Sequence, residues 1–159
     1  MGADTLLPWT VGAGAEGNSG MAAAIKATKN AIGYVEYVQA TQAGLSVALV
    51  QNRAGKFVKP EPASFQAAAA SADWAATGDF HLLLTDAPGD DAYPIAATVF
   101  VLMSREPSLL QRPQATLRFF QWALEKGADE AAELGYVPLP APLVEQVKDY
   151  WAKTFRTGA

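Results

Sequence analysis

The sequence contains no cysteine and a single histidine, and these shortages narrow its chemistry. Without cysteine the chain has no disulfide bond, no thiolate nucleophile and no cysteine ligand for zinc. Cysteine content therefore does not indicate whether the protein works in an oxidising or a reducing compartment. One histidine cannot build a metal site by itself, and His81 stands between Phe80 and Leu82 in an apolar stretch. We therefore expect neither a metal site nor a cofactor.

Basic clusters and long apolar runs are missing as well. The chain carries 12 Lys and Arg against 16 Asp and Glu, a net charge of −4, so the attraction that draws proteins to nucleic acid is weak and we expect no nucleic-acid partner. Residues 99–103 form one of the longest apolar runs, far short of the roughly 20 residues that cross a bilayer. We expect no membrane insertion, and the first residues lack the basic and apolar regions of a signal peptide.

The pattern of apolar and turn-forming residues predicts an α/β chain. Amphipathic spacing, with capping residues and glycines at the ends, predicts helices at residues 21–29, 36–43, 64–70, 111–126, 128–134 and 143–155. β-Branched and aromatic residues predict strands at residues 32–37 and 80–84, a hairpin of residues 46–51 and 56–59, and a long extended segment at residues 93–103.

Particular residues should mark the ends of these helices. Asn18 or Ser19 is expected to cap the first helix and Ser64 the third, because their side-chain oxygens can accept hydrogen bonds from first-turn N–H groups. Gly44 and Gly127 are expected just after helix ends, where glycine readily adopts a left-handed conformation. The aromatic residues at helical spacing should pack in the core: Phe119, Phe120, Trp122, Tyr150 and Trp151.

A glycine-rich loop raises the alternative of a nucleotide-binding enzyme. Residues Gly12–Gly17 match the spacing G-x-G-x-x-G, and Glu36 falls near the place of a ribose-binding acid. That fingerprint needs a buried strand entering the first glycine, and Pro8 interrupts the short stretch before it. The residues favour a flexible loop that leads into a helix, whose N-terminal N–H groups can attract an anion.

Acidic residues gather in one stretch: Asp79, Asp86, Asp90 and Asp91. Paired carboxylates can carry acid–base catalysis, but the glycine and proline beside these residues are typical of a solvated turn. We therefore predict no catalytic residue and no enzyme.

Several separate blocks, in order and in register, give a stronger signal. Gly17-Asn18-Ser19-Gly20 opens a helix and is followed by Ala-Ile-Gly-Tyr-Val-Glu-Tyr at residues 31–37. Later blocks continue the match at residues 72–74, 91–95, 117–123, 139–140 and 144–147. Over roughly residues 4–155 the chain resembles the C-terminal half of the PstS family, the periplasmic substrate-binding proteins of phosphate ABC transporters.

The resemblance implies a type II periplasmic-binding-protein fold, with a mixed sheet flanked by helices and two lobes that close on one oxyanion. It implies an incomplete two-lobe fold here. Residues 1–92 would be the C-terminal portion of the inserted lobe, and residues 93–159 would supply a crossing strand and the C-terminal helices of the other lobe. A missing N-terminal half, or self-association, would complete the lobes.

The same resemblance implies a phosphate-binding component of an ABC-type phosphate import system in the periplasm, with inorganic phosphate and the permease subunits as partners. In the family the main phosphate contacts come from a Ser-Gly-Thr loop, a nearby Arg and residues further upstream, none of which can be matched here. The candidate ligand-binding residues are those of a helix N-terminus: Gly17, Asn18, Ser19 and Gly20. The alternative is a fragment or structural partner without ligand binding, which needs a separate N-terminal half.

Overall fold

Two units, Met1–Ser46 and Val47–Ala159, make up the chain. The structure is a computed structural model and describes residues 9–104 and 113–155. The lobe boundary expected between residues 92 and 93 falls inside the second unit and remains a prediction.

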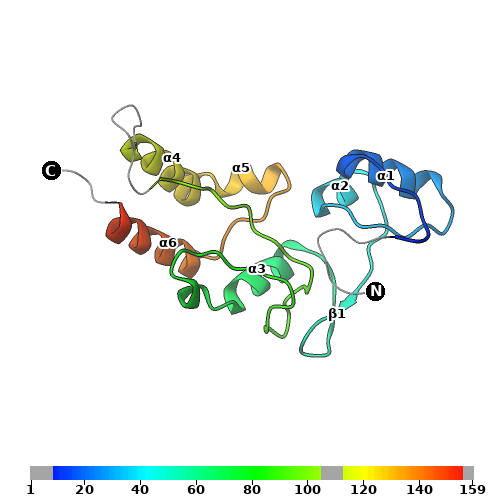
Figure 1. Cartoon of the computed structure of the whole chain (residues 1–159), viewed down its shortest axis with the longest axis horizontal. Coiled ribbons are helices and arrows are strands. Elements are labelled where there is room, and N and C mark those ends of the chain that lie inside the picture. Colours follow the sequence, from blue (N-terminus) through cyan, green and yellow to red (C-terminus); the bar gives the residue numbers. More distant parts are fainter. Residues whose placement is uncertain (1–8, 105–112, 156–159) are drawn as a thin grey trace. The chain divides into compact units, whose positions relative to one another are not determined.

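The first unit is built on two helices, α1 (Gly17–Ala27) and α2 (Tyr37–Gln42), which lie side by side (Figure 1). Their buried residues are small, Ala22 on α1 and Ala40 on α2. Helix α2 ends as predicted before Gly44, whose φ of +63° lies in the left-handed region that glycine adopts without strain.

The segment between these helices is pressed against α1 at Gly33. A Cβ added to Gly33 would lie 2.7 Å from Ile25 Cδ1 and 3.1 Å from Met21 Sδ, so this close approach requires glycine. The strand predicted at residues 32–37 is wrong, because residues 31–36 form no strand and α2 already begins at Tyr37.

The second unit begins with the predicted hairpin, although its strands are short. Strand β1 (Val50–Gln51) pairs antiparallel with β2 (Phe57–Val58), with Val50 opposite Val58. The turn is closed by a 2.9 Å hydrogen bond from the Gly55 N–H to the Asn52 carbonyl, and Gly55 has a φ of +81°. The turn residues of the sequence therefore placed this hairpin correctly.

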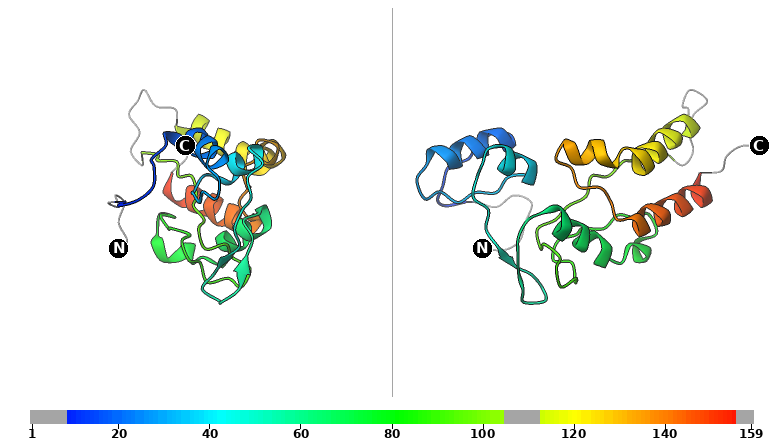
Figure 2. Two further views of the ribbon diagram at one scale, coloured as in Figure 1. Left: turned by 90° about the vertical axis from the view of Figure 1, so that its right-hand side faces the viewer. Right: turned by 180° about the vertical axis from the view of Figure 1, so that it is seen from behind.

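Helices complete the described part of the second unit: α3 (Pro62–Ser71), the 3₁₀ turn η1 (Trp74–Thr77), α4 (Pro113–Lys126), α5 (Ala128–Glu133) and α6 (Ala141–Thr154). Helix α6 packs between α3 and α4, and the view from behind shows the same order (Figure 2). The corresponding helix predictions are confirmed to within a few residues, apart from residues 111–112, which lie outside the described residues. None of the described helices is both long and apolar enough to cross a membrane.

The core of this unit is an apolar cluster made of Ala68, Ala69, Trp74, Leu84, Ala87, Ala92, Ala96 and Leu143. Trp74 is the largest of these side chains, and its indole N–H donates to the Ala69 carbonyl at 2.7 Å. Phe80 stacks on Trp74 and meets Tyr150 of α6 edge-on at 5.4 Å between ring centroids. Aromatic contacts therefore join η1 to α6.

Two predictions about helix ends need correction. Helix α3 begins before Ser64, with Glu61 as its N-cap, and the Ser64 hydroxyl accepts a 3.1 Å hydrogen bond from the Glu61 N–H as part of a capping box. Gly127 follows α4 as expected, but its φ is −91°. A Cβ there would lie 2.8 Å from the Ala123 carbonyl oxygen, so Gly127 matters for its missing side chain and not for a left-handed backbone.

The aromatic residues of α4 also differ from the prediction. Phe119 and Trp122 are exposed, and their rings contact each other at 6.1 Å between centroids. The apolar stripe read from the sequence is wider than the face of α4 that meets its neighbours, so these two rings lie outside the core.

The sheet is smaller than the sequence predicts. Residues 80–84 and 93–103 form no strand, and the antiparallel β1–β2 pair is the sheet found among the described residues. The predicted mixed sheet is therefore not found in the part that the structure describes. The fold combines helices with a small open sheet, and the type II two-lobe architecture remains a prediction.

Candidate functional site

The predicted ligand-binding residues, Gly17 to Gly20, form the first turn of α1. The expectation that Asn18 or Ser19 caps this helix is wrong, because α1 begins at Gly17 and its N-cap is Glu16, which makes no side-chain capping bond. Gly17 has a φ of +64° at the entry to the helix, a conformation that favours glycine. The glycine-rich loop thus bends the chain into α1.

The polar side chains of this turn bind the neighbouring helix. The Asn18 Oδ1 atom accepts a 3.1 Å hydrogen bond from the Glu36 N–H at the N-cap of α2, and the Ser19 hydroxyl donates to Gln39 Oε1 at 3.3 Å. Lys26, in the last turn of α1, donates to the carbonyl of Ala43, the C-cap of α2, at 3.1 Å. These three contacts hold the two helices of the first unit together.

The chemistry left to this turn is that of backbone N–H groups. The first four N–H groups of a helix have no partner within the helix, and the helix dipole favours an anion beside them. Since the Asn18 and Ser19 side chains are engaged with α2, an anion here would be held mainly by the backbone of α1. Direct ligand binding at Gly17–Gly20 therefore remains a prediction.

The nucleotide alternative lacks its structural context in the described residues. Residues 9–11, just before Gly12, form no strand, so no strand enters the glycine-rich loop from that part of the chain. The Glu36 backbone N–H is held by Asn18, at the start of α2 and not at a strand end. The geometry does not match a dinucleotide fingerprint.

Asn52 is a structural residue that the sequence did not reveal. It is a buried polar side chain, 6% exposed. Its amide Nδ2 donates to the carbonyls of Asp90 at 2.7 Å, Ala92 at 3.1 Å and Gly89 at 3.4 Å, while its Oδ1 accepts from the Lys56 N–H at 3.0 Å. Asn52 therefore fixes the hairpin to the loop that precedes residue 93. A single sequence marks Asn52 as a turn residue but carries no signal for partners almost forty residues away.

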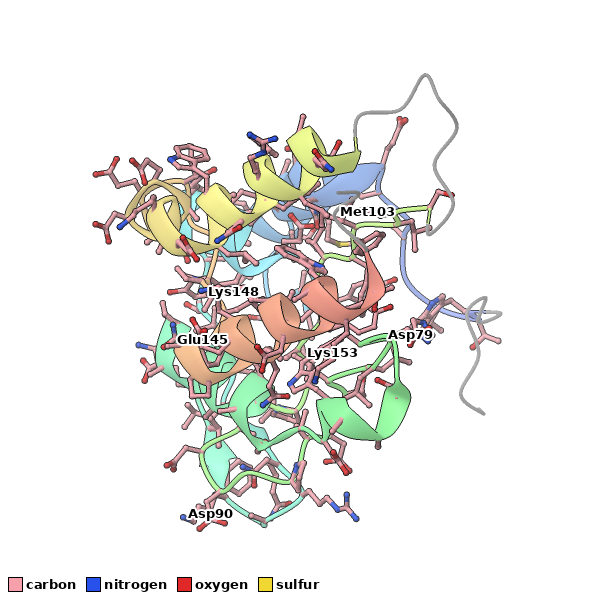
Figure 3. All side chains as sticks on the ribbon, turned by 90° about the vertical axis from the view of Figure 1, so that its left-hand side faces the viewer. Asp79, Asp90, Met103, Glu145, Lys148 and Lys153 are labelled. Carbon is pink, nitrogen blue, oxygen red and sulfur yellow. The ribbon has the colours of Figure 1, made fainter. Side chains whose placement is uncertain are left out.

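The acidic loop is tied to the same hairpin by an ion pair. Lys56 Nζ lies 2.8 Å from Asp90 Oδ2, and both side chains are largely exposed. The hydrogen bond to Asp90 raises the pKa of the Lys56 ammonium. Asp90 stands apart from the other labelled acidic residues (Figure 3). The described residues contain no group of three or more His, Asp and Glu that could hold a metal ion.

A second ion pair joins α4 to α6. Lys148 Nζ lies 2.8 Å from Glu125 Oε1 and 3.1 Å from Glu145 Oε1, and Figure 3 shows Lys148 and Glu145 together on α6. The hydrogen bond from Lys148, with a second from Gln121, lowers the pKa of Glu125. The hydrogen bond to Glu125 raises the pKa of Lys148. The contact between Lys148 and Glu125 therefore links α6 to α4, and the contact between Lys148 and Glu145 lies within α6.

Comparison with known proteins tests the resemblance to the PstS family. The phosphate-binding protein PstS of Xylella fastidiosa (strain Temecula1) is 44% identical over 156 residues, which are 98% of this chain and 43% of that protein. PstS of Pasteurella multocida is 40% identical over 143 residues, 90% of this chain and 42% of that protein. The chain resembles one half of PstS. PstS of Methanocaldococcus jannaschii is 33% identical over 141 residues, 81% of this chain and 36% of that protein.

The resemblance to PstS predicted from the sequence is thus confirmed, and the chain spans less than half the length of the PstS relatives. No protein-family model matches the chain. The names of these relatives describe phosphate-binding proteins and not enzymes.

Proposed function

We propose that this chain forms one half of the phosphate-binding component of an ABC-type phosphate import system. The observation that carries the proposal is the 44% identity to a PstS protein across 98% of the chain. In this proposal the protein acts in the periplasm, binds inorganic phosphate, passes it to permease subunits and catalyses no reaction.

The main phosphate contacts come from outside this chain in our proposal. The predicted ligand turn supports this, because its two polar side chains, Asn18 and Ser19, are engaged with α2. A phosphate stripped of water needs several preorganised donors to replace its hydration. The turn at Gly17–Gly20 then positions α1 beside the ligand cleft and adds backbone N–H groups at most.

The lobe assignment follows from the same proposal. Residues 1–92 belong to one lobe and residues 93–159 to the other, with a separate N-terminal half completing both. The Asn52 hydrogen bonds support a loop at residues 89–92 that is held to the hairpin just before the proposed crossing point.

Calorimetric phosphate titration of two proteins tests the function. The first is this chain alone, and the second is a chimera in which the chain replaces the matched 43% of the Xylella fastidiosa relative. We expect weak or no binding by the chain alone and tight binding by the chimera, with sulfate as the control oxyanion. Asn18→Ala in the chimera should weaken binding only modestly, because we place the main donors elsewhere.

Two results would contradict this proposal. Submicromolar phosphate binding by the chain alone would place the main donors within it and would direct attention to the N-terminus of α1. A chimera that unfolds cooperatively but binds no phosphate would remove the phosphate function itself.

A further inference from the structure

Met21 directly follows the predicted ligand turn on α1, and its thioether packs against the segment that leads to α2. The Sδ atom lies 3.1 Å from the position that a Cβ would take on Gly33, and Ile25 Cδ1 lies 2.7 Å from the same position. Met21 and Ile25 are four residues apart on α1 and therefore share one face of the helix. Together they form a contact between α1 and residues 31–36.

This contact matters because the first unit buries little else. In the described part of that unit, the buried residues are Ala22 and Ala40, whose side chains are single methyl groups. Helices α1 and α2 have 11 and 6 residues, too few for helices that are stable without packing. The three side-chain hydrogen bonds between the helices join exposed groups. The packing of the first unit therefore depends on a few partly buried side chains, and Met21 is one of them.

The sulfur of Met21 can also react with a small oxidant. Met21 is partly buried and not fully enclosed. A thioether reacts with hydrogen peroxide when a sulfur lone pair attacks one peroxide oxygen, which forms the S–O bond and breaks the O–O bond. The sulfur is oxidised by two electrons, and the peroxide is reduced to one water molecule. The product is methionine sulfoxide.

A sulfoxide would not fit the contact at Gly33. Oxidation converts a flexible apolar side chain into a polar one, and its oxygen is a hydrogen-bond acceptor that is costly to bury without a donor. The Ile25 side chain at this contact is apolar and offers no donor. The oxygen gains its hydrogen bonds when the Met21 side chain turns toward water, and Gly33 then loses one of its two partners on α1.

We propose that Met21 is an oxidation site, at which hydrogen peroxide forms a sulfoxide that loosens residues 31–36 from α1. Methionine sulfoxide can be reduced enzymatically, so the modification is reversible. Its effect would reach the predicted ligand turn, because the Asn18 side chain accepts its hydrogen bond from the Glu36 N–H at the end of the same segment. The proposal goes beyond phosphate binding and does not depend on it.

Peroxide treatment of the full chain tests the proposal. Peptide mass spectrometry would follow sulfoxide formation at Met21 and at Met103, the two methionines of the described ranges, and hydrogen–deuterium exchange would follow the backbone. Once Met21 is oxidised, the amides of α1 and α2 should exchange on the order of tenfold faster, because local opening becomes easier. The amides of α3 and α6 should be unaffected. Treatment with methionine sulfoxide reductases should restore the original rates.

Three variants separate the modification from general damage. Met21→Leu keeps an apolar side chain of similar volume without sulfur, so the exchange in α1 should stay close to that of the wild type and should not respond to peroxide. Met103→Leu is the matched control in the second unit (Figure 3), and peroxide should still accelerate exchange in α1. Met21→Gln places a polar side chain of similar length at the contact, and it should accelerate exchange on the order of tenfold without peroxide.

Each remaining outcome would overturn the proposal. Met21 could resist peroxide under conditions that fully oxidise Met103, in which case its sulfur is not accessible. Exchange in α1 and α2 could stay unchanged in oxidised wild type or in Met21→Gln, in which case the thioether contact does not hold the segment. An equal response to peroxide in Met21→Leu would place the effect elsewhere. Amides of α1 that exchange at the rate of an unfolded peptide before oxidation would leave no packed unit to loosen. None of these measurements uses phosphate, so the proposed function is tested separately.

Discussion

Replacing Asn52 with alanine should loosen the hairpin from the loop at residues 86–92. The substitution removes the amide donor that serves the carbonyls of Asp90 and Ala92 at 2.7 and 3.1 Å, with a longer contact to Gly89 at 3.4 Å. It also removes the Oδ1 acceptor of the Lys56 N–H at 3.0 Å. Three of these contacts have good hydrogen-bond geometry by distance.

The expected loss of stability follows from the number of hydrogen bonds removed. A typical hydrogen bond contributes a net 0.5–1.5 kcal/mol, roughly, and a buried group left without a partner costs about 1–3 kcal/mol. Because Asp90 is exposed, its carbonyl can bind water once the Asn52 amide is removed, whereas Ala92 is buried. We therefore expect a loss of about 2–4 kcal/mol, a large part of the roughly 5–15 kcal/mol that stabilises a typical domain.

Urea unfolding and amide exchange at residues 86–92 measure this loss. Asn52→Asp should cost at least as much as Asn52→Ala, because a carboxylate oxygen would then face the carbonyls that now accept the amide. The exposed turn residue Arg53 provides the matched control, and Arg53→Ala should change the free energy of unfolding by less than about 0.5 kcal/mol. If Asn52→Ala matches the wild type in both measurements, the Asn52 hydrogen bonds do not stabilise the fold.

Two further predictions concern the helices. Gly33→Ala should lower the free energy of unfolding by about 1–3 kcal/mol, because the new methyl group overpacks against Ile25. Faster amide exchange in α1 would show this loss. Gly14→Ala is the control and should leave the stability unchanged, since no atom lies within 4 Å of its new Cβ. The Glu125–Lys148 pair should make the α4–α6 packing sensitive to acid, because the pKa of Glu125 is lowered in the folded state. The stability that the pair contributes is complete above the ordinary pKa of 4.5 and is lost as the pH falls through the lowered pKa of Glu125. Glu125→Gln should flatten the acid side of the thermal unfolding profile and the exposed Glu133→Gln should not; equal slopes in both variants would contradict the assignment.

Local patterns predicted the helices and the hairpin well, because their signals lie within a few residues. The apolar spacing located α4 and α6, Gly44 marked the end of α2, and the turn at residues 52–55 placed the hairpin. The prediction that Ser64 caps α3 was wrong by only a few residues, because Glu61 is the N-cap and Ser64 lies in the first turn of the helix.

The strands and the site could not be predicted in the same way, because their partners are distant. Residues 32–37, 80–84 and 93–103 have strand composition, but a strand also needs a neighbour, and none pairs with them in the described ranges. Asn18 could be placed at a helix start from sequence, yet its hydrogen bond to the Glu36 N–H depends on how α1 and α2 pack.

The packing of α6 between α3 and α4 has a consequence for synthesis of the chain. Gln66 of α3 donates to the Pro138 carbonyl, 72 residues later, and the α3 alanines share their core with Leu143 of α6. At roughly 5–20 residues per second, a ribosome needs about 4–14 s to cover that distance. The first unit faces no such delay, since the Asn18–Glu36 bond spans 18 residues. The apolar face of α3 on a nascent chain therefore stays without its α6 partner for several seconds after α3 itself has been synthesised.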